Sequence, residues 1–178
     1  MVLAAGASRR LGRAKQSLEI GGETLLGRAV RVAVEAGLGP AIVVLRDPEM
    51  GKSLRGCELV VNALADEGMA SSIRAGVARA RELGVAGVVL MACDQVALRA
   101  EHLRALSGDV GRVTGSGYAG KVGIPAYFPA ENFGELMELQ GDVGARELLR
   151  GAAVVVDEGL GLDVDTEGDF QRARGRLG

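Results

Sequence analysis

The chain opens with MVLAAGASRRLGRAK (residues 1–15), a short apolar run followed by a loop with two glycines, a serine and several cations. A glycine loop directly after a strand can cradle a polyphosphate, because its backbone N–H groups and fixed positive charges face the anion. The spacing differs from two common phosphate-binding loops. Five residues separate Gly6 from Gly12, Arg13 follows where a Walker A loop requires Lys-Ser/Thr, and GxGxxG is absent.

Apolar runs alternate with helical segments along the rest of the chain. The runs AIVVL (residues 41–45) and VVLM (88–91) contain no polar residue, which is typical of strands buried on both faces of a parallel sheet. Shorter apolar runs predict further strands at 1–5, 58–62, 112–118, 124–128 and 154–156.

Helices are predicted between these strands. Thr24 is a good N-cap for a helix over 25–36, and Ser71 or Ser72 would cap a helix over 73–83. More helices are expected at 101–106, 132–139, 142–149 and from 167 onward.

This alternation, with short connections, predicts a three-layer α/β fold with a doubly wound, mainly parallel sheet. At 178 residues the chain is long enough for one such domain and too short for two, so we expect a single domain over residues 1–178. Open sheets of this kind bind ligands at the carboxyl ends of their strands. Functional residues are therefore expected in the loops at that edge.

Composition excludes several classes of function. A formal net charge of -2 gives no general attraction to a polyanion, so no nucleic-acid partner is expected. The longest apolar stretch, residues 85–93, is far shorter than the roughly 20 residues that cross a bilayer, so no membrane span is expected. The two cysteines lack CxxC spacing and the chain lacks a signal pattern at its start, which predicts a cytoplasmic protein.

Acidic residues at strand ends are candidates for metal binding. Asp94 follows the apolar strand 88–91 almost directly. Asp163 and Asp165 lie two residues apart and, if extended, point the same way, so either could bind the metal while the other caps the last helix. Mg²⁺ prefers oxygen ligands and usually takes one or two carboxylates together with phosphates and water. The pattern therefore predicts a magnesium site that includes Asp94.

Four other side chains have predicted roles. Arg10 and Lys15 are expected to neutralise the charge of a triphosphate. His102 lies among charged residues and is expected to face solvent, and Cys93 is expected to be a small buried hydrophobe. For Lys121 the sequence leaves two interpretations open, a surface cation or a contact to an anionic acceptor.

The opening loop resembles the signature LAAGxSxRxGxxK of the MobA-like nucleotidyltransferases, which have a Rossmann-like fold. The matching residues are Leu3, Ala4, Ala5, Gly6, Ser8, Arg10, Gly12 and Lys15. The resemblance implies a catalytic role for Arg10, Lys15 and Asp94, and a Mg²⁺ site formed by Asp94 and Asp165. It implies that nucleotide binds to Leu3, Ala4, Ala5, Gly6, Ser8, Arg10, Lys15, Asn62, Gly68, Met69, Ser71 and Ser72. It implies that the acceptor binds to Gly123, Pro125, Gly141, Asp142 and Arg146.

Two later segments, GDVGAR (141–146) and DVDT (163–166), resemble the molybdenum cofactor cytidylyltransferase branch of this family. The resemblance implies transfer of CMP from CTP to molybdopterin with release of pyrophosphate, and a molybdenum hydroxylase as partner. Guanylyl-transferring relatives usually carry Leu-Ala-Gly-Gly where this chain has Ala5. A methyl group beside the base narrows the slot for a purine, so Ala5 favours a pyrimidine.

Two alternatives stay open at this point. The first is a nucleotidyltransferase of the same fold that acts on another phosphorylated acceptor, as GTP-type or sugar-phosphate-type enzymes do. Ile124 favours it, because the family usually has histidine there. The second is a nucleotide-binding accessory protein without catalysis, against which Arg10, Lys15, Asp94 and Asp165 argue.

Overall fold

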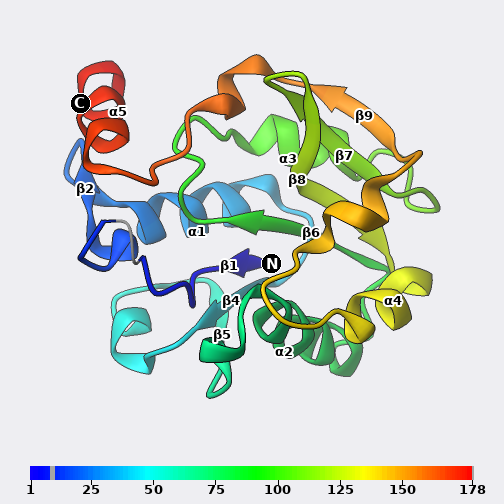
Figure 1. Ribbon diagram of the computed structural model, residues 1–178. Helices are drawn as coiled ribbons and strands as arrows, with labels where there is room; N and C mark the ends of the chain where they lie inside the picture. Colours follow the sequence, from blue (N-terminus) through cyan, green and yellow to red (C-terminus); the bar gives the residue numbers. More distant parts are fainter. Residues whose placement is uncertain (9–10, 178) are drawn as a thin grey trace.

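A seven-stranded sheet forms the middle layer of the protein (Figure 1). The computed structural model describes residues 1–8 and 11–177. The strand order is β5-β4-β1-β6-β8-β7-β9. The strands span Val2–Leu3 (β1), Ala41–Leu45 (β4), Cys57–Val61 (β5), Gly87–Ala92 (β6), Thr114–Tyr118 (β7), Lys121–Pro129 (β8) and Ala153–Val156 (β9).

Most neighbouring strands run parallel, as predicted. β5, β4, β1 and β6 form a parallel block, and β7 pairs parallel with β9. β8 is the exception, because it pairs antiparallel with both β6 and β7. All five residues of β4 are buried, which explains why this strand contains no polar residue.

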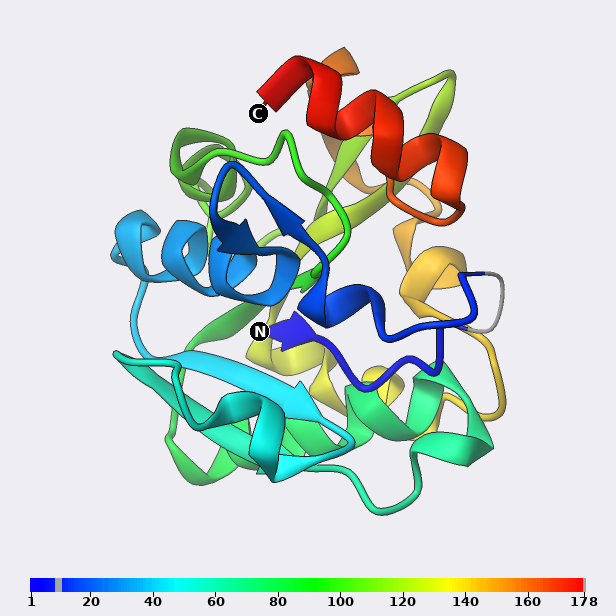
Figure 2. The ribbon, with the colours of Figure 1, turned by 90° about the vertical axis from the view of Figure 1, so that its left-hand side faces the viewer.

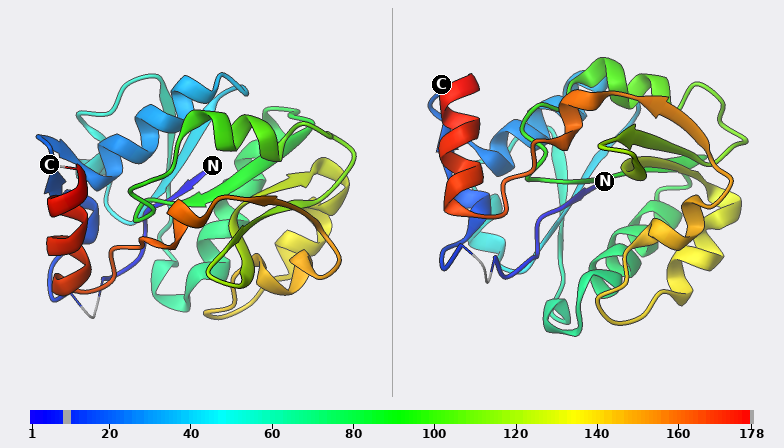
Figure 3. Two further views of the ribbon diagram at one scale, coloured as in Figure 1. Left: turned by 90° about the horizontal axis from the view of Figure 1, so that it is seen from above. Right: turned by 45° about the horizontal axis from the view of Figure 1, so that its top comes forward.

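Helices cover both faces of the sheet. α1 (Leu25–Ala36) and α3 (Ala100–Leu106) lie side by side on one face, whereas α2 (Met69–Glu82) and α4 (Phe133–Glu138) pack together on the other (Figures 1 and 3). Each pair buries its own apolar core against the sheet. The predicted three-layer, mainly parallel α/β fold is therefore confirmed. Within the described residues, no helix is both long and apolar enough to cross a membrane.

Two helix starts show how well caps can be predicted. The Thr24 side chain accepts a hydrogen bond from the Gly27 amide at 3.0 Å, and α1 begins where predicted. The prediction for α2 was wrong: this helix begins at Met69, after Gly68, and not at residue 73. Ser71 and Ser72 therefore lie inside its first turn and are not caps.

Two further differences concern short elements. A single 3-10 segment, Ala145–Leu149, replaces the helix expected over 142–149. A small hairpin of β2 (Glu19–Ile20) and β3 (Glu23–Thr24) was not predicted. It lies beside the last helix, α5 (Glu167–Leu177) (Figure 2). Two-residue strands carry too little periodicity to be recognised.

Candidate nucleotide and metal site

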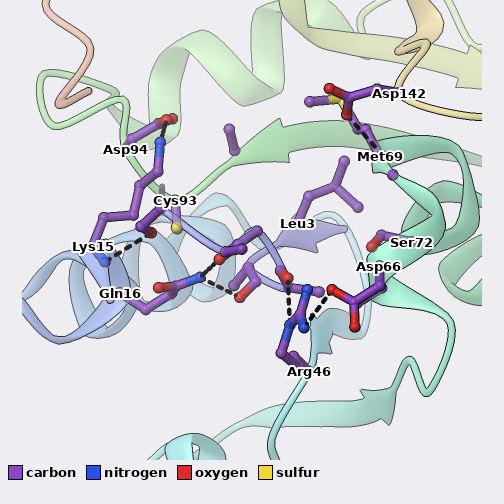
Figure 4. Close-up of a pocket in the computed structure, with 18 of the residues that line it drawn as sticks. Leu3, Lys15, Gln16, Arg46, Asp66, Met69, Ser72, Cys93, Asp94 and Asp142 are labelled. Atoms are coloured by element: carbon purple, nitrogen blue, oxygen red, sulfur yellow. Dashed lines mark hydrogen bonds and ion pairs between the residues drawn. The ribbon is translucent and has the colours of Figure 1, made fainter. Parts of the chain in front are cut away.

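A cavity of about 400 Å³ opens at the carboxyl ends of β1 and β6 (Figure 4). Its wall includes the glycine loop from Leu3 to Ser8, the strand end 92–94, the segment 65–69 and residues from several other segments, among them Arg46, Asp142 and Asp165. Leu3, Ala4, Ala5, Gly6, Ser8, Lys15, Gly68, Met69, Ser72, Asp94, Asp142 and Asp165 all line it. The structure thus brings most of the residues predicted for nucleotide and metal around one space.

The glycine loop is held in place by a glutamine that the sequence analysis did not single out. Gln16 is 4% exposed, and its Nε2 donates to the carbonyls of Ala4 and Gly6 at 2.7 and 2.9 Å. The Lys15 amide donates to the Ser8 Oγ at 3.0 Å, which closes the loop on itself. Arg10, predicted to neutralise phosphate, lies outside the described residues.

Lys15 joins the two carboxylates that were predicted to bind metal. Its Nζ lies 2.5 Å from Asp94 Oδ2 and 3.0 Å from Asp165 Oδ1. Burial alone would lower the pKa of this ammonium, but the charges and hydrogen bonds of Asp94 and Asp165 outweigh burial and raise the pKa. Lys15 therefore stays protonated and keeps the two carboxylates together.

The donor set suits a hard divalent cation that also binds phosphate. Asp94 and Asp165 both reach one cationic centre, and both offer only oxygen. No group of three or more His, Cys, Asp or Glu among the described residues could hold a metal alone. Mg²⁺ usually completes its shell with phosphate oxygens and water, so two carboxylates are a sufficient protein contribution. Asp94 and Asp165 would hold the ion.

The third aspartate of this cluster has a different environment. Burial, and next the charge of Asp94, raise the pKa of Asp163 to about 6, and its buried Oδ1 has no hydrogen-bond partner. At the start of α5, Thr166 and Asp169 exchange hydrogen bonds, with the Thr166 amide donating to Asp169 Oδ2 at 2.7 Å and the Asp169 amide donating to Thr166 Oγ1 at 3.2 Å. The cap that these bonds form is Thr166, whereas the sequence predicted Asp163 or Asp165.

Three polar residues predicted to bind nucleotide form a buried network. Asn62, Ser71 and Ser72 are 5%, 3% and 6% exposed. The Asn62 Nδ2 donates to the Ser71 and Ser72 hydroxyls at 2.9 and 3.0 Å, and its Oδ1 accepts from the Leu64 amide at 2.9 Å. Of the three, only Ser72 lines the cavity. Asn62 and Ser71 hold the segment that forms the cavity wall.

Replacing Asn62 with alanine is therefore expected to lower the free energy of unfolding by about 1–3 kcal/mol, the cost of leaving buried hydroxyl and amide groups unpaired. Urea unfolding followed by circular dichroism measures the change. Asn132→Ala is the matched control, because the buried Oδ1 of Asn132 has no hydrogen-bond partner to lose. Equal losses in the two variants would show that the network contributes nothing specific.

The segment predicted to bind the acceptor packs against the start of α2. Asp142 Oδ1 accepts from the Met69 amide at 3.3 Å, and the Gly141 carbonyl accepts from the Ala70 amide at 3.1 Å. Gly68 has a φ of 107°, and a Cβ built on it would lie 2.5 Å from the Gly141 oxygen, so only glycine fits. Of the predicted acceptor residues only Asp142 lines the cavity; Gly123, Pro125, Gly141 and Arg146 lie outside its wall.

Arg46 is a cavity residue that the sequence analysis missed. It directly follows β4, and its Nη1 lies 2.8 Å from Asp66 Oδ1 while its Nε donates to the Ala5 carbonyl at 3.4 Å. Figure 4 places Arg46 and Asp66 at the opposite end of the cavity from Lys15 and Asp94. Its position at a strand end was the available signal, the same one that identified Asp94.

The prediction for His102 was wrong, whereas Cys93 behaves as expected. His102 is 6% exposed, and its Nε2 lies 2.7 Å from the Ser116 Oγ. It lies on the face of α3 that packs against the sheet, so its charged sequence neighbours gave a misleading signal. Burial raises the pKa of the Cys93 thiol to about 12, so this cavity residue is a poor nucleophile.

An enzyme that transfers a nucleotidyl group needs a cradle for a triphosphate beside oxygen ligands for a divalent metal. A glycine loop facing paired carboxylates across a strand-end cavity suits both needs and defines the class as a nucleotidyltransferase. Residues 1–157 match the MobA-like NTP transferase domain, and the chain belongs to that family.

One of two relatives extends this match over nearly the whole chain. The chain is 31% identical to the purine catabolism protein PucB of Bacillus subtilis (strain 168) over 191 aligned residues, which cover 97% of this chain and 93% of PucB. It is 38% identical to a probable molybdenum cofactor guanylyltransferase of Opitutus terrae over 99 residues, which cover 56% of this chain and 48% of the relative.

A solved structure shares the fold. The crystal structure of Rv0371c from Mycobacterium tuberculosis H37Rv superposes with a TM-score of 0.82 at 33% identity, covering 98% of this chain and 95% of Rv0371c. A second structure of Rv0371c is a complex with manganese, with a TM-score of 0.80 at 31% identity, covering 98% of this chain and 96% of that protein. Nucleotidyltransferases of this fold use divalent metals.

Proposed function

We propose that this protein transfers CMP from CTP to molybdopterin and releases pyrophosphate, with Mg²⁺ as its metal. The observation that carries the proposal is the Lys15 ammonium between Asp94 and Asp165, directly beside the glycine loop. The Ala4-Ala5-Gly6 start of the loop and the segments 141–146 and 163–166 support a cytidylyl enzyme of the molybdenum cofactor branch.

The reaction requires an oxygen of the acceptor phosphate to attack the α-phosphorus of CTP. The bond from that phosphorus to the bridging oxygen of the β-phosphate breaks, and pyrophosphate leaves with the electron pair. A phosphate monoester is already mostly ionised near neutral pH, since its second pKa is about 6, so the reaction needs no strong general base. The absence of a catalytic histidine from the described cavity wall is consistent with this chemistry.

The protein's contribution is positioning and charge. Amides of the loop from Gly6 to Ser8 would hold the phosphates, and Gln16 keeps that loop rigid through two backbone carbonyls. Lys15 would neutralise charge on the triphosphate, and Arg10 is proposed to act with it. When bound, Mg²⁺ would polarise phosphate oxygens. Asp94 and Asp165 would fix its place relative to the loop.

The cavity wall supports a small base. Ala5 lines the cavity and is 3% exposed, so this residue is held firmly in the cavity wall. Guanine needs more space than cytosine, and a fixed methyl at this point disfavours the larger ring. The relative named as a guanylyltransferase makes GTP the alternative donor to test.

Among the four nucleoside triphosphates, supplied with molybdopterin and Mg²⁺, CTP is expected to give pyrophosphate release with the highest kcat/KM. The preference over GTP should be at least about tenfold, the size expected when a small pocket rejects a larger group. Ala5→Gly should reduce the preference for CTP over GTP, because removing the methyl group leaves more space for the guanine ring. A higher kcat/KM for GTP in the unchanged protein would show that it is a guanylyltransferase.

The remaining expectations belong to the same proposal. We infer that residues 1–178 act as one domain in the cytoplasm, with no nucleic-acid partner, and that a molybdenum hydroxylase receives the product. Turnover of a sugar phosphate in place of molybdopterin would change the acceptor and keep the chemistry. Magnesium-dependent turnover of any acceptor would exclude a non-catalytic accessory protein.

A further inference from the structure

The hairpin of β7 and β8 carries a lysine held over a tyrosine ring. Tyr118 and Lys121 face each other in the strand register, and Lys121 Nζ lies 5.1 Å from the centre of the Tyr118 ring. Tyr118 is 5% exposed, whereas Lys121 is exposed. An ammonium over an aromatic face is attracted by the ring. The hairpin therefore presents a partly fixed cation to solvent.

This cation is tied to the cavity through the backbone of β8. The Tyr118 hydroxyl donates to the Ile124 carbonyl at 2.9 Å, and Gln95 Nε2 donates to the same carbonyl at 2.8 Å. Ile124 lines the cavity, and Gln95 is the neighbour of Asp94. The lysine and the catalytic carboxylate are thus attached to one hydrogen-bonded unit.

Three carboxylates lie beside this unit, and their negative charge would repel an anionic acceptor. Asp94, Asp163 and Asp165 all lie close enough to influence one another, and Lys121 offsets part of their charge on Asp163. Lys15 already pairs with two of these carboxylates. A dianionic acceptor phosphate approaching the same place would be repelled unless another cation met it.

Lys121 and Arg146 are exposed cations that can meet it. Neither forms an ion pair with a carboxylate among the described residues. Arg146 lies near enough to act on the Tyr118 hydroxyl, whose pKa is raised to about 12 by burial and then by Asp163 and Asp94, with Arg146 opposing the rise. Of the two, Lys121 is the one that lies over the Tyr118 ring.

We propose that Lys121, positioned by the Tyr118 ring, binds the phosphate monoester of the acceptor. The assignment to the acceptor rests on the proposed function; the binding of a phosphate anion does not. This subsite gives Lys121 a function that its sequence context left undecided.

Binding of inorganic phosphate tests the subsite without any turnover. The chain has two tyrosines, so ring signals of Tyr118 and Tyr127 can be followed separately by NMR. Tyr127 lies at the other end of this hairpin, paired with Thr114, where its hydroxyl donates to the Val110 carbonyl, and it serves as an internal reference. Phosphate should shift the Tyr118 signals and leave those of Tyr127 in place. Lys121→Met should weaken this binding at least about tenfold, the loss expected for one hydrogen bond to a charged group.

Two further variants make the result specific. Lys121→Arg should keep binding within about threefold, because the charge remains. Lys52→Met removes an exposed lysine that pairs with Glu49 and should leave phosphate binding unchanged. Unmoved Tyr118 signals, or equal phosphate affinity for Lys121→Met and the unchanged protein, would overturn the proposal.

Kinetics then separate this subsite from the proposed function. With CTP and molybdopterin, Lys121→Met should raise the KM for molybdopterin at least about tenfold and leave the KM for CTP within about twofold. No turnover in the unchanged protein, combined with phosphate binding at Tyr118, would reject molybdopterin as acceptor and retain the subsite. Equal rises of both KM values would assign Lys121 to the nucleotide and overturn the acceptor assignment.

Discussion

Asp94→Asn is expected to lower turnover at least about a hundredfold, comparable to losing one preorganised electrostatic partner at the transition state. Asp94 follows β6 at the cavity edge and holds the Lys15 ammonium at 2.5 Å. An amide of the same shape keeps the packing and removes the charge. The fold should stay nearly intact, and nucleotide affinity without metal should change little, since loop amides and Lys15 remain.

Steady-state kinetics over a range of Mg²⁺ concentrations measure this effect, and thermal unfolding checks the fold. Asp109→Asn is the control, because Asp109 lies outside the cavity and accepts a hydrogen bond within its own turn, from the Gly111 amide. Near-normal turnover of Asp94→Asn with unchanged magnesium dependence would reduce Asp94 to a residue that merely ends its strand.

Lys15→Met should lower kcat/KM for the triphosphate between about a hundredfold and a thousandfold, because it removes the described cation closest to both carboxylates. The same substitution also changes the metal site. Lys15 occupies the space between Asp94 and Asp165, with hydrogen bonds of 2.5 and 3.0 Å, so the two carboxylates lose their shared partner in the variant. Their mutual repulsion then favours binding of a divalent ion in its place.

Direct titration with Mn²⁺ in the absence of nucleotide measures this second effect. The affinity for Mn²⁺ should rise about tenfold or more in Lys15→Met, because two carboxylates without their lysine attract the ion more strongly. Lys52→Met should bind Mn²⁺ as the unchanged protein does. If Lys15→Met binds Mn²⁺ no better and turns over normally, then Lys15 is only a structural ion-pair partner.

The local features that a few neighbouring residues decide could be predicted from the sequence. The unalternating runs at 41–45 and 88–91 became β4 and β6, and Thr24 caps α1 as expected. The start of α2 could not be predicted, because Gly141 and Asp142 pair with its first amides from more than 70 residues away. A helix end that a distant segment satisfies leaves no cap signal in its own sequence.

In the candidate site, too, local features could be predicted from the sequence, whereas contacts between distant residues could not. The sequence by itself determined the family, the strand-end position of Asp94 and the presence of a glycine loop after the first strand, since motif spacing and apolar runs are local. Only the tertiary structure decided that Lys15 meets both Asp94 and Asp165, that Gln16 supports the loop, and that Asn62 holds the wall behind the cavity. It also decided that His102 is buried, because helix α3 turns that side toward the sheet. Contacts between residues far apart in the chain depend on how the layers pack, and that packing is a property of the whole fold.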